Sequence, residues 1–84
     1  MTSEGPRVKY NLHDGYVQVR EDGDWRFLDP RAYILHAGRD AAVTNLLTDV
    51  QELLDPDPTE IELEHIRKLV LEAVETATTI MARS

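Results

Sequence analysis

The chain has 84 residues, a formal net charge of −7 at pH 7 and no cysteine. This length allows one small domain, and the lack of cysteine excludes disulfide bridges and thiolate metal sites. No apolar run approaches the roughly 20 residues that cross a bilayer, and the negative charge disfavours non-specific binding to nucleic acids and to anionic membranes.

The two halves of the chain differ in charge. Residues 1–40 carry a net charge of −1 and residues 41–84 a net charge of −6, with seven acids and no base between Asp49 and Glu64. We interpret this acidic stretch as a solvated surface; a basic partner, or mimicry of nucleic-acid charge, is the alternative. Residues 1–7 lack the apolar core of a signal peptide. We therefore expect a cytoplasmic protein with a flexible tail over 1–7 and a single domain over 8–84.

The first strands are marked by two Asp-Gly pairs, Asp14-Gly15 and Asp22-Gly23, which stand between alternating apolar residues. Asp-Gly is a strong hairpin signal because both residues tolerate the positive φ of a tight turn. The sequence therefore predicts a three-stranded antiparallel meander. A two-residue loop at the first pair would place Tyr10 opposite Val19 and keep the apolar side chains of both strands on one face.

The second hairpin is predicted to close with a longer loop. A three-residue loop over residues 21–23, with Gly23 left-handed, pairs Val19 with Trp25, whereas a two-residue loop would move Trp25 to the opposite face. We select the three-residue loop and predict that Trp25 is buried between sheet and helices. The predicted apolar face is Val8, Tyr10, Leu12, Val17, Val19, Trp25 and Phe27.

The other face of the predicted sheet is polar and leans basic. Such a face is most often the solvated side of a one-sided sheet, although it can also bind a peptide or enter a nucleic-acid groove. The candidate partner-binding residues on this face are Lys9, Asn11, Tyr16, Gln18, Arg20 and Arg26.

Three helices are predicted after the sheet. Asp29-Pro30 is typical of a helix start, and Gly38 of the end of that short helix. Apolar residues at helical spacing predict a second helix over residues 40–54. Two Asp-Pro pairs then break the chain over residues 55–58. Asp57 or Thr59 is expected to cap a third helix that runs to about residue 82.

The third helix carries a heptad seam and more apolar surface than one packing partner needs. Packing on its own core, pairing with a second copy and binding a foreign partner would each explain the surplus. We predict a homodimer, because a self-complementary patch serves both subunits. The candidate interface residues are Leu63, Ile66, Val70, Ala73, Ala77 and Ile80.

The residue types needed for catalysis are scarce. The only serines, Ser3 and Ser84, lie near the ends of the chain, so nucleophilic triads are nearly excluded. The three histidines are widely spaced and match no zinc motif, and the glycines are isolated, so no phosphate-binding loop is present. We therefore predict no catalytic residues, no cofactor-binding residues, no metal site and no enzymatic activity.

The order of these elements predicts an α+β fold: a three-stranded antiparallel β-meander followed by a short helix and two longer helices packed on one sheet face. The favoured function is protein–protein interaction by a small acidic accessory or regulatory protein, of a size common among phage-encoded proteins. The partner is a protein of unknown identity, together with a second copy of the chain.

Two alternatives stay open. The order of elements over residues 8–75 is similar to that of the domains that bind leader peptides of ribosomally made modified peptides, although no specific motif is shared and the last helix is longer than expected. This resemblance implies an extended peptide bound at a sheet edge. The second alternative is DNA binding through the polar sheet face, and nucleic acid is the less favoured partner because of the net charge.

Overall fold

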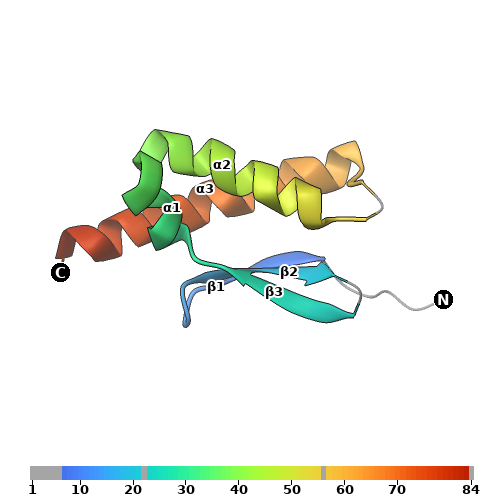
Figure 1. Ribbon diagram of the computed structural model, residues 1–84, viewed down its shortest axis with the longest axis horizontal. Coiled ribbons are helices and arrows are strands. Elements are labelled where there is room, and N and C mark those ends of the chain that lie inside the picture. Colours follow the sequence, from blue (N-terminus) through green and yellow to red (C-terminus); the bar gives the residue numbers. More distant parts are fainter. Residues whose placement is uncertain (1–6, 22, 56, 84) are drawn as a thin grey trace.

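The computed structural model describes residues 7–21, 23–55 and 57–83 and has the predicted α+β fold (Figure 1). The sheet has the order β1-β2-β3 and is antiparallel throughout. Three helices lie on one face of the sheet, and no described element covers the other face (Figure 1). The elements are β1 (Val8–Asn11), β2 (Tyr16–Glu21), β3 (Asp24–Leu28), α1 (Pro30–Ala37), α2 (Arg39–Leu53) and α3 (Glu60–Arg83).

The core lies between the inner face of the sheet and helices α2 and α3. Valines from β1 and β2 meet aliphatic side chains of both helices there, and burial of this apolar surface is the main force that holds the two layers together. Among the described residues, no helix is long and apolar enough to cross a membrane. The buried cluster contains Val8, Val17, Val19, Ala42, Leu46, Val50, Leu54, Ile66, Leu69, Val70, Ala73 and Val74.

The apolar seam of α3 belongs to this core. Ile66, Val70 and Ala73 are fully buried in it, and Ala77 is nearly so, because α3 packs at once against α1, α2 and β1. The predicted homodimer seam is therefore wrong for these four residues. The surplus of apolar surface covers several elements of the same chain. Leu63 is half-buried and Ile80 is exposed, and the homodimer itself stays a prediction without this seam.

The first hairpin pairs Tyr10 with Val17, two residues away from the predicted register. Its connection spans residues 12–15, and Gly15 adopts a positive φ of 81°. The Asn11 side chain stabilises this longer turn, because its Oδ1 accepts a hydrogen bond from the His13 backbone N–H at 2.9 Å. A shift of two residues preserves the faces of both strands. The inner valines therefore stay inside as predicted, while Leu12 leaves the sheet and is exposed.

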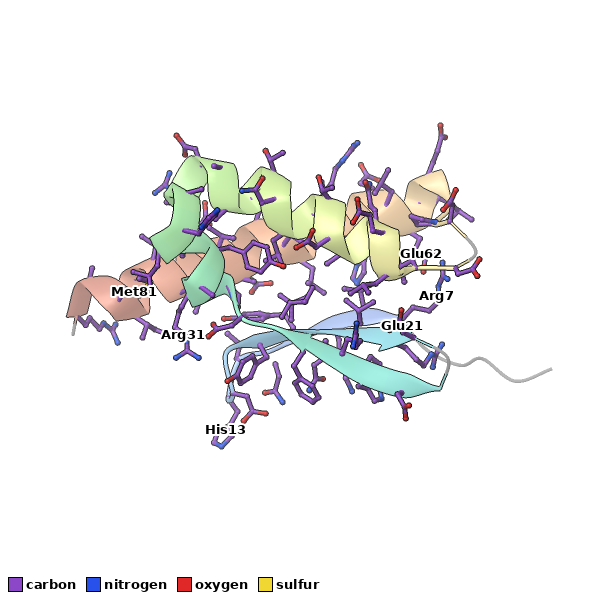
Figure 2. All side chains as sticks on the ribbon, viewed as in Figure 1. Arg7, His13, Glu21, Arg31, Glu62 and Met81 are labelled. Atoms are coloured by element: carbon purple, nitrogen blue, oxygen red, sulfur yellow. The ribbon has the colours of Figure 1, made fainter. Side chains whose placement is uncertain are left out.

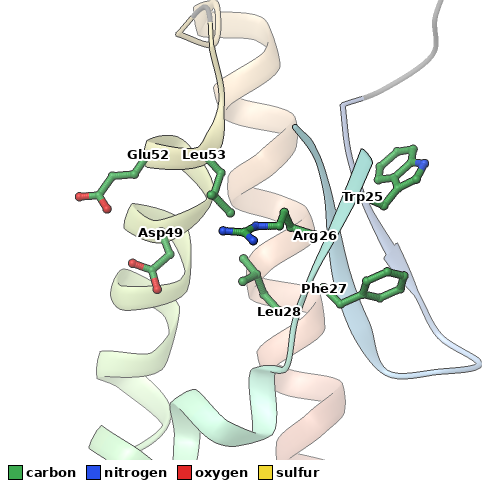
Figure 3. Close-up of a pocket in the computed structure, with 7 residues that line it drawn as sticks. All are labelled: Trp25, Arg26, Phe27, Leu28, Asp49, Glu52 and Leu53. Carbon is green, nitrogen blue, oxygen red and sulfur yellow. The ribbon is translucent and has the colours of Figure 1, made fainter. Parts of the chain in front are cut away.

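The second hairpin pairs Val19 with Arg26 and Arg20 with Trp25. This is the register of a two-residue turn, in which Gly23 has the expected positive φ of 86°, and the predicted three-residue loop is wrong. The difference of one residue exchanges the two faces of β3. Trp25 therefore lies on the side of the sheet away from the helices (Figure 3), and the prediction that it is buried between the layers is also wrong.

The register of the second hairpin turns Leu28 toward the helices, where it is partly buried. Leu28 stands opposite Val17 and packs against the core from the last position of β3. Arg26 takes the inner position opposite Val19, where its side chain is still 61% exposed and its Nε lies 3.2 Å from Oε1 of Glu21. A long charged side chain at a sheet edge can cover apolar surface while its head stays in water. The inner position therefore does not bury an arginine charge.

The helix boundaries match the capping signals. Asp29 caps α1, because its Oδ1 accepts the Arg31 backbone N–H at 3.1 Å, and Gly38 with a φ of 91° separates α1 from α2. Thr59, one of the two predicted candidates, caps α3: its Oγ1 accepts the backbone N–H of Glu62 at 3.1 Å.

The Glu62 side chain binds Arg7, the first described residue of the chain (Figure 2). The Arg7 guanidinium donates two hydrogen bonds to it, at 2.8 and 3.0 Å. This contact chiefly lowers the pKa of Glu62 and raises that of Arg7. Arg7 was placed in the predicted flexible tail, yet it is joined to α3; the rest of that tail lies outside the described residues.

The lowered pKa of Glu62 predicts a pH-dependent contribution to stability. The pair stabilises the fold fully above the ordinary glutamate pKa of 4.5, and this contribution is lost as the pH falls through the lower pKa of the folded state. The two side chains are 20% and 26% exposed, so we expect Glu62→Gln to lower the free energy of unfolding by about 1 kcal/mol at pH 7. The deficit should shrink in urea titrations as the pH falls below 4.5. A deficit that does not change with pH would contradict this assignment.

Candidate protein-interaction site

The uncovered side of the sheet carries aromatic and cationic side chains together. Side chains alternate between the two faces along a strand, so the observed registers show which seven side chains lie on this side. We call it the outer sheet face. It consists of Lys9, Asn11, Tyr16, Gln18, Arg20, Trp25 and Phe27.

Trp25 lies between two cations at one end of this face. The Lys9 Nζ is 4.5 Å from the centroid of its ring, and the Arg20 Cζ is 5.9 Å away. Both distances are within the range of cation–π attraction. Lys9 reaches the ring across β2 and so passes over Gln18, which is only 9% exposed. The polar side chains thus half-bury the indole without help from the helices.

A second aromatic pair lies further along the same face. The rings of Phe27 and Tyr16 meet edge to face, with centroids 5.9 Å apart and an angle of 89° between their planes. This is a favoured geometry for two aromatic rings. The Arg31 guanidinium carbon is 5.8 Å from the Tyr16 ring. Phe27 nevertheless remains 55% exposed, so it offers apolar surface that a ligand could cover.

The charge of the outer sheet face is opposite to that of the whole chain. The strand residues with charged side chains that alternate onto this face are Lys9 and Arg20, whereas Glu21 and Asp24 belong to the inner side at the hairpin tip. The net charge of the chain is −7. The molecule therefore presents a small cationic and aromatic surface on an otherwise acidic body.

The sequence predicted most of this surface. Five of the six predicted sheet residues lie together on the outer sheet face, and Arg26 does not, because the two-residue turn moves it to the inner side. The same shift brings in Trp25 and Phe27, which the sequence pattern predicts on the apolar face. The signal for the correct register was present in Asp22-Gly23, which is itself a typical two-residue hairpin loop.

A groove of about 440 Å³ opens on the other side of β3, between this strand and α2 (Figure 3). Arg26 and Leu28 point into the space between β3 and α2, whereas the rings of Trp25 and Phe27 point to the opposite side of the sheet (Figure 3). The residues that line the groove are Trp25, Arg26, Phe27, Leu28, Asp49, Glu52 and Leu53.

One wall of the groove is held by a half-buried phenol. The Tyr33 hydroxyl donates a hydrogen bond to Oδ2 of Asp49 and so joins α1 to α2. Burial, and then this carboxylate, raise the pKa of Tyr33 well above its ordinary value of 10.0. The phenol therefore keeps its proton at neutral pH and fixes the position of Asp49.

Metal-ligating side chains do not cluster in the described part of the chain. There, no group of three or more His, Cys, Asp and Glu side chains could hold a metal ion. The described histidines are exposed and lie on three different elements or loops. The expectation that the chain needs no cofactor and has no enzymatic activity stays a prediction.

Comparison with protein-family models, with curated proteins and with solved structures finds no match to this chain.

The two cations around Trp25 predict selective quenching of its fluorescence. Iodide is attracted to Lys9 and Arg20, whereas caesium is repelled by them. Trp25 is the single tryptophan of the chain, so the whole signal reports on this face. We expect iodide to quench more strongly than caesium in the folded protein, and the order to reverse in Lys9→Glu/Arg20→Glu. Equal and weak quenching by both ions would place the indole in the core instead.

Proposed function

We propose that the chain is a non-enzymatic interaction module that binds an acidic partner protein through the outer sheet face. The observation that supports this is the cluster of Trp25 with Lys9 and Arg20 on an uncovered face. Tryptophan, tyrosine and arginine are the residues most enriched at the energetic centres of protein interfaces. The exposed ring of Phe27 adds apolar area beside them.

Charge complementarity selects the kind of partner. A partner with carboxylates around an apolar patch would meet Lys9 and Arg20 while it covers Phe27 and Trp25. Single-stranded nucleic acid could also stack on the aromatic rings. It is the less favoured ligand, because the chain as a whole carries a charge of −7 and repels phosphates at long range.

Two further expectations, on oligomeric state and on location, stand as follows. A homodimer through α3 is not part of it, because most of the predicted seam is buried in the chain's own core. A cytoplasmic location is retained from the sequence, on the ground that a chain without cysteine suits a reducing compartment.

The test uses a charge reversal on the outer sheet face and a matched one elsewhere. The wild type, Lys9→Glu/Arg20→Glu and the control Arg67→Glu/Lys68→Glu on the exposed surface of α3 are each immobilised and exposed to an extract of the source organism. Bound proteins are quantified by mass spectrometry. We expect an acidic protein that the wild type and the control retain equally, and that the outer-face variant retains at least tenfold less.

Two results would overturn the proposal. The first is a set of bound proteins that does not change in the outer-face variant although its thermal melt is unchanged. The second is nuclease-sensitive retention that falls steeply with salt, which would identify nucleic acid as the ligand of this face.

A further inference from the structure

The outer edge of β3 is open. In the described part of the chain the sheet ends at this strand, with β2 as its only neighbour. The backbone N–H of Arg20 donates to the Arg7 carbonyl at 2.8 Å, so the backbone of Arg20 faces β1. Hydrogen-bonding direction alternates along a strand. The backbone N–H and C=O groups of Val19 therefore point to Arg26 on β3. Those of Arg26 point back to β2, and those of its neighbours Trp25 and Phe27 point to the open edge.

The groove between β3 and α2 lies directly beside this edge. Trp25 and Phe27 line it although their rings point to the opposite side of the sheet (Figure 3). They therefore contribute their backbone, which is what an unpaired strand edge offers. An added strand would hydrogen-bond to these two residues and would send every second side chain into the groove.

The walls of the groove define the side chains that suit it. Leu28 and Leu53 supply an apolar base. Asp49 and Glu52 stand on the α2 wall, and within the described residues neither forms an ion pair. Arg26, which also lines the groove, is paired with Glu21 at 3.2 Å. The groove therefore favours an aliphatic side chain together with an added positive charge.

We propose that this edge and groove bind an extended basic peptide as a fourth strand of the sheet. An aliphatic side chain of the peptide lies over Leu28 and Leu53, and a lysine or arginine two residues away faces Asp49 and Glu52. A second copy of the chain suits the site less well, because it would bring the same two acids against those of the first copy. The proposal concerns a different site from the outer sheet face and does not depend on it.

The probe is a phage-displayed library of random dodecapeptides, selected on the wild-type chain and counter-selected on an unrelated protein of similar negative charge. We expect enriched peptides with a basic residue and an aliphatic residue two positions apart, and no proline between them. A fluorescein-labelled synthetic copy is then titrated by anisotropy. N-methylation of its backbone in the paired stretch should abolish binding, because it removes the ladder hydrogen bonds.

Matched variants locate the bound peptide. Glu52→Lys should weaken binding at least tenfold, whereas Glu72→Lys, an equal charge change on the exposed surface of α3, should leave it within twofold. Lys9→Glu/Arg20→Glu should also leave it unchanged or strengthen it. On binding, the amide protons of Trp25 and Phe27 should become protected from hydrogen exchange.

Three outcomes would overturn this inference. Enrichment of no peptide above the counter-selected protein would show that the groove binds no such ligand. Loss of binding in Lys9→Glu/Arg20→Glu but not in Glu52→Lys would assign the peptide to the outer sheet face. Protection of the Trp25 and Phe27 amides without peptide, together with a dimer in sedimentation, would identify a second copy as the occupant.

Discussion

The pairing of Val19 with Arg26 across the second hairpin decides what each side of the sheet carries. Strand side chains alternate with a period of two, so this one pair fixes all of β3. It packs Leu28 against the core and places both Trp25 and Phe27 on the uncovered side. The same pair leaves Arg26 at the mouth of the groove beside α2. Both proposed surfaces therefore depend on one register.

A small domain that keeps its only tryptophan out of its core is unusual in physical terms, because a large aromatic side chain offers much apolar area for burial. Here valines and leucines fill the inner layer, and α3 supplies a continuous apolar stripe that reaches several elements. Trp25 is instead partly covered by Lys9 and Arg20, whose positive charges are attracted to the face of the indole ring. The stability of the core does not require the indole, which leaves it available for a ligand.

The parts of the fold that were predicted from the sequence have local causes. Helix starts at Asp29 and Thr59 depend on capping side chains a few residues away, and the turn glycines depend on their own backbone. The strand order follows from two short hairpins. These signals lie within a few positions of the elements that they define, so the elements can be predicted from the sequence alone.

The parts that were not predicted depend on what meets in space. Periodicity shows that Val70 and Ala73 share an apolar stripe, but it does not say whether that stripe meets the chain's own sheet or a second copy. The sequence pattern predicts the wrong register for the second hairpin, because burial of the large indole side chain favours the three-residue loop. The groove depends on the distance between α2 and the open edge of β3, and no spacing in the sequence reports that distance.

The central claim is the register of the second hairpin, and cross-strand nuclear Overhauser effects measure it directly. Residues that face each other without mutual hydrogen bonds bring their backbones closest in an antiparallel pair. The structure predicts strong contacts between the α-protons of Arg20 and Trp25 and between those of Gln18 and Phe27. Strong α-proton contacts between Gln18 and Arg26 and between Arg20 and Asp24 would contradict it. They belong to the register that pairs Val19 with Trp25, which would return the rings of Trp25 and Phe27 to the core and remove the outer sheet face.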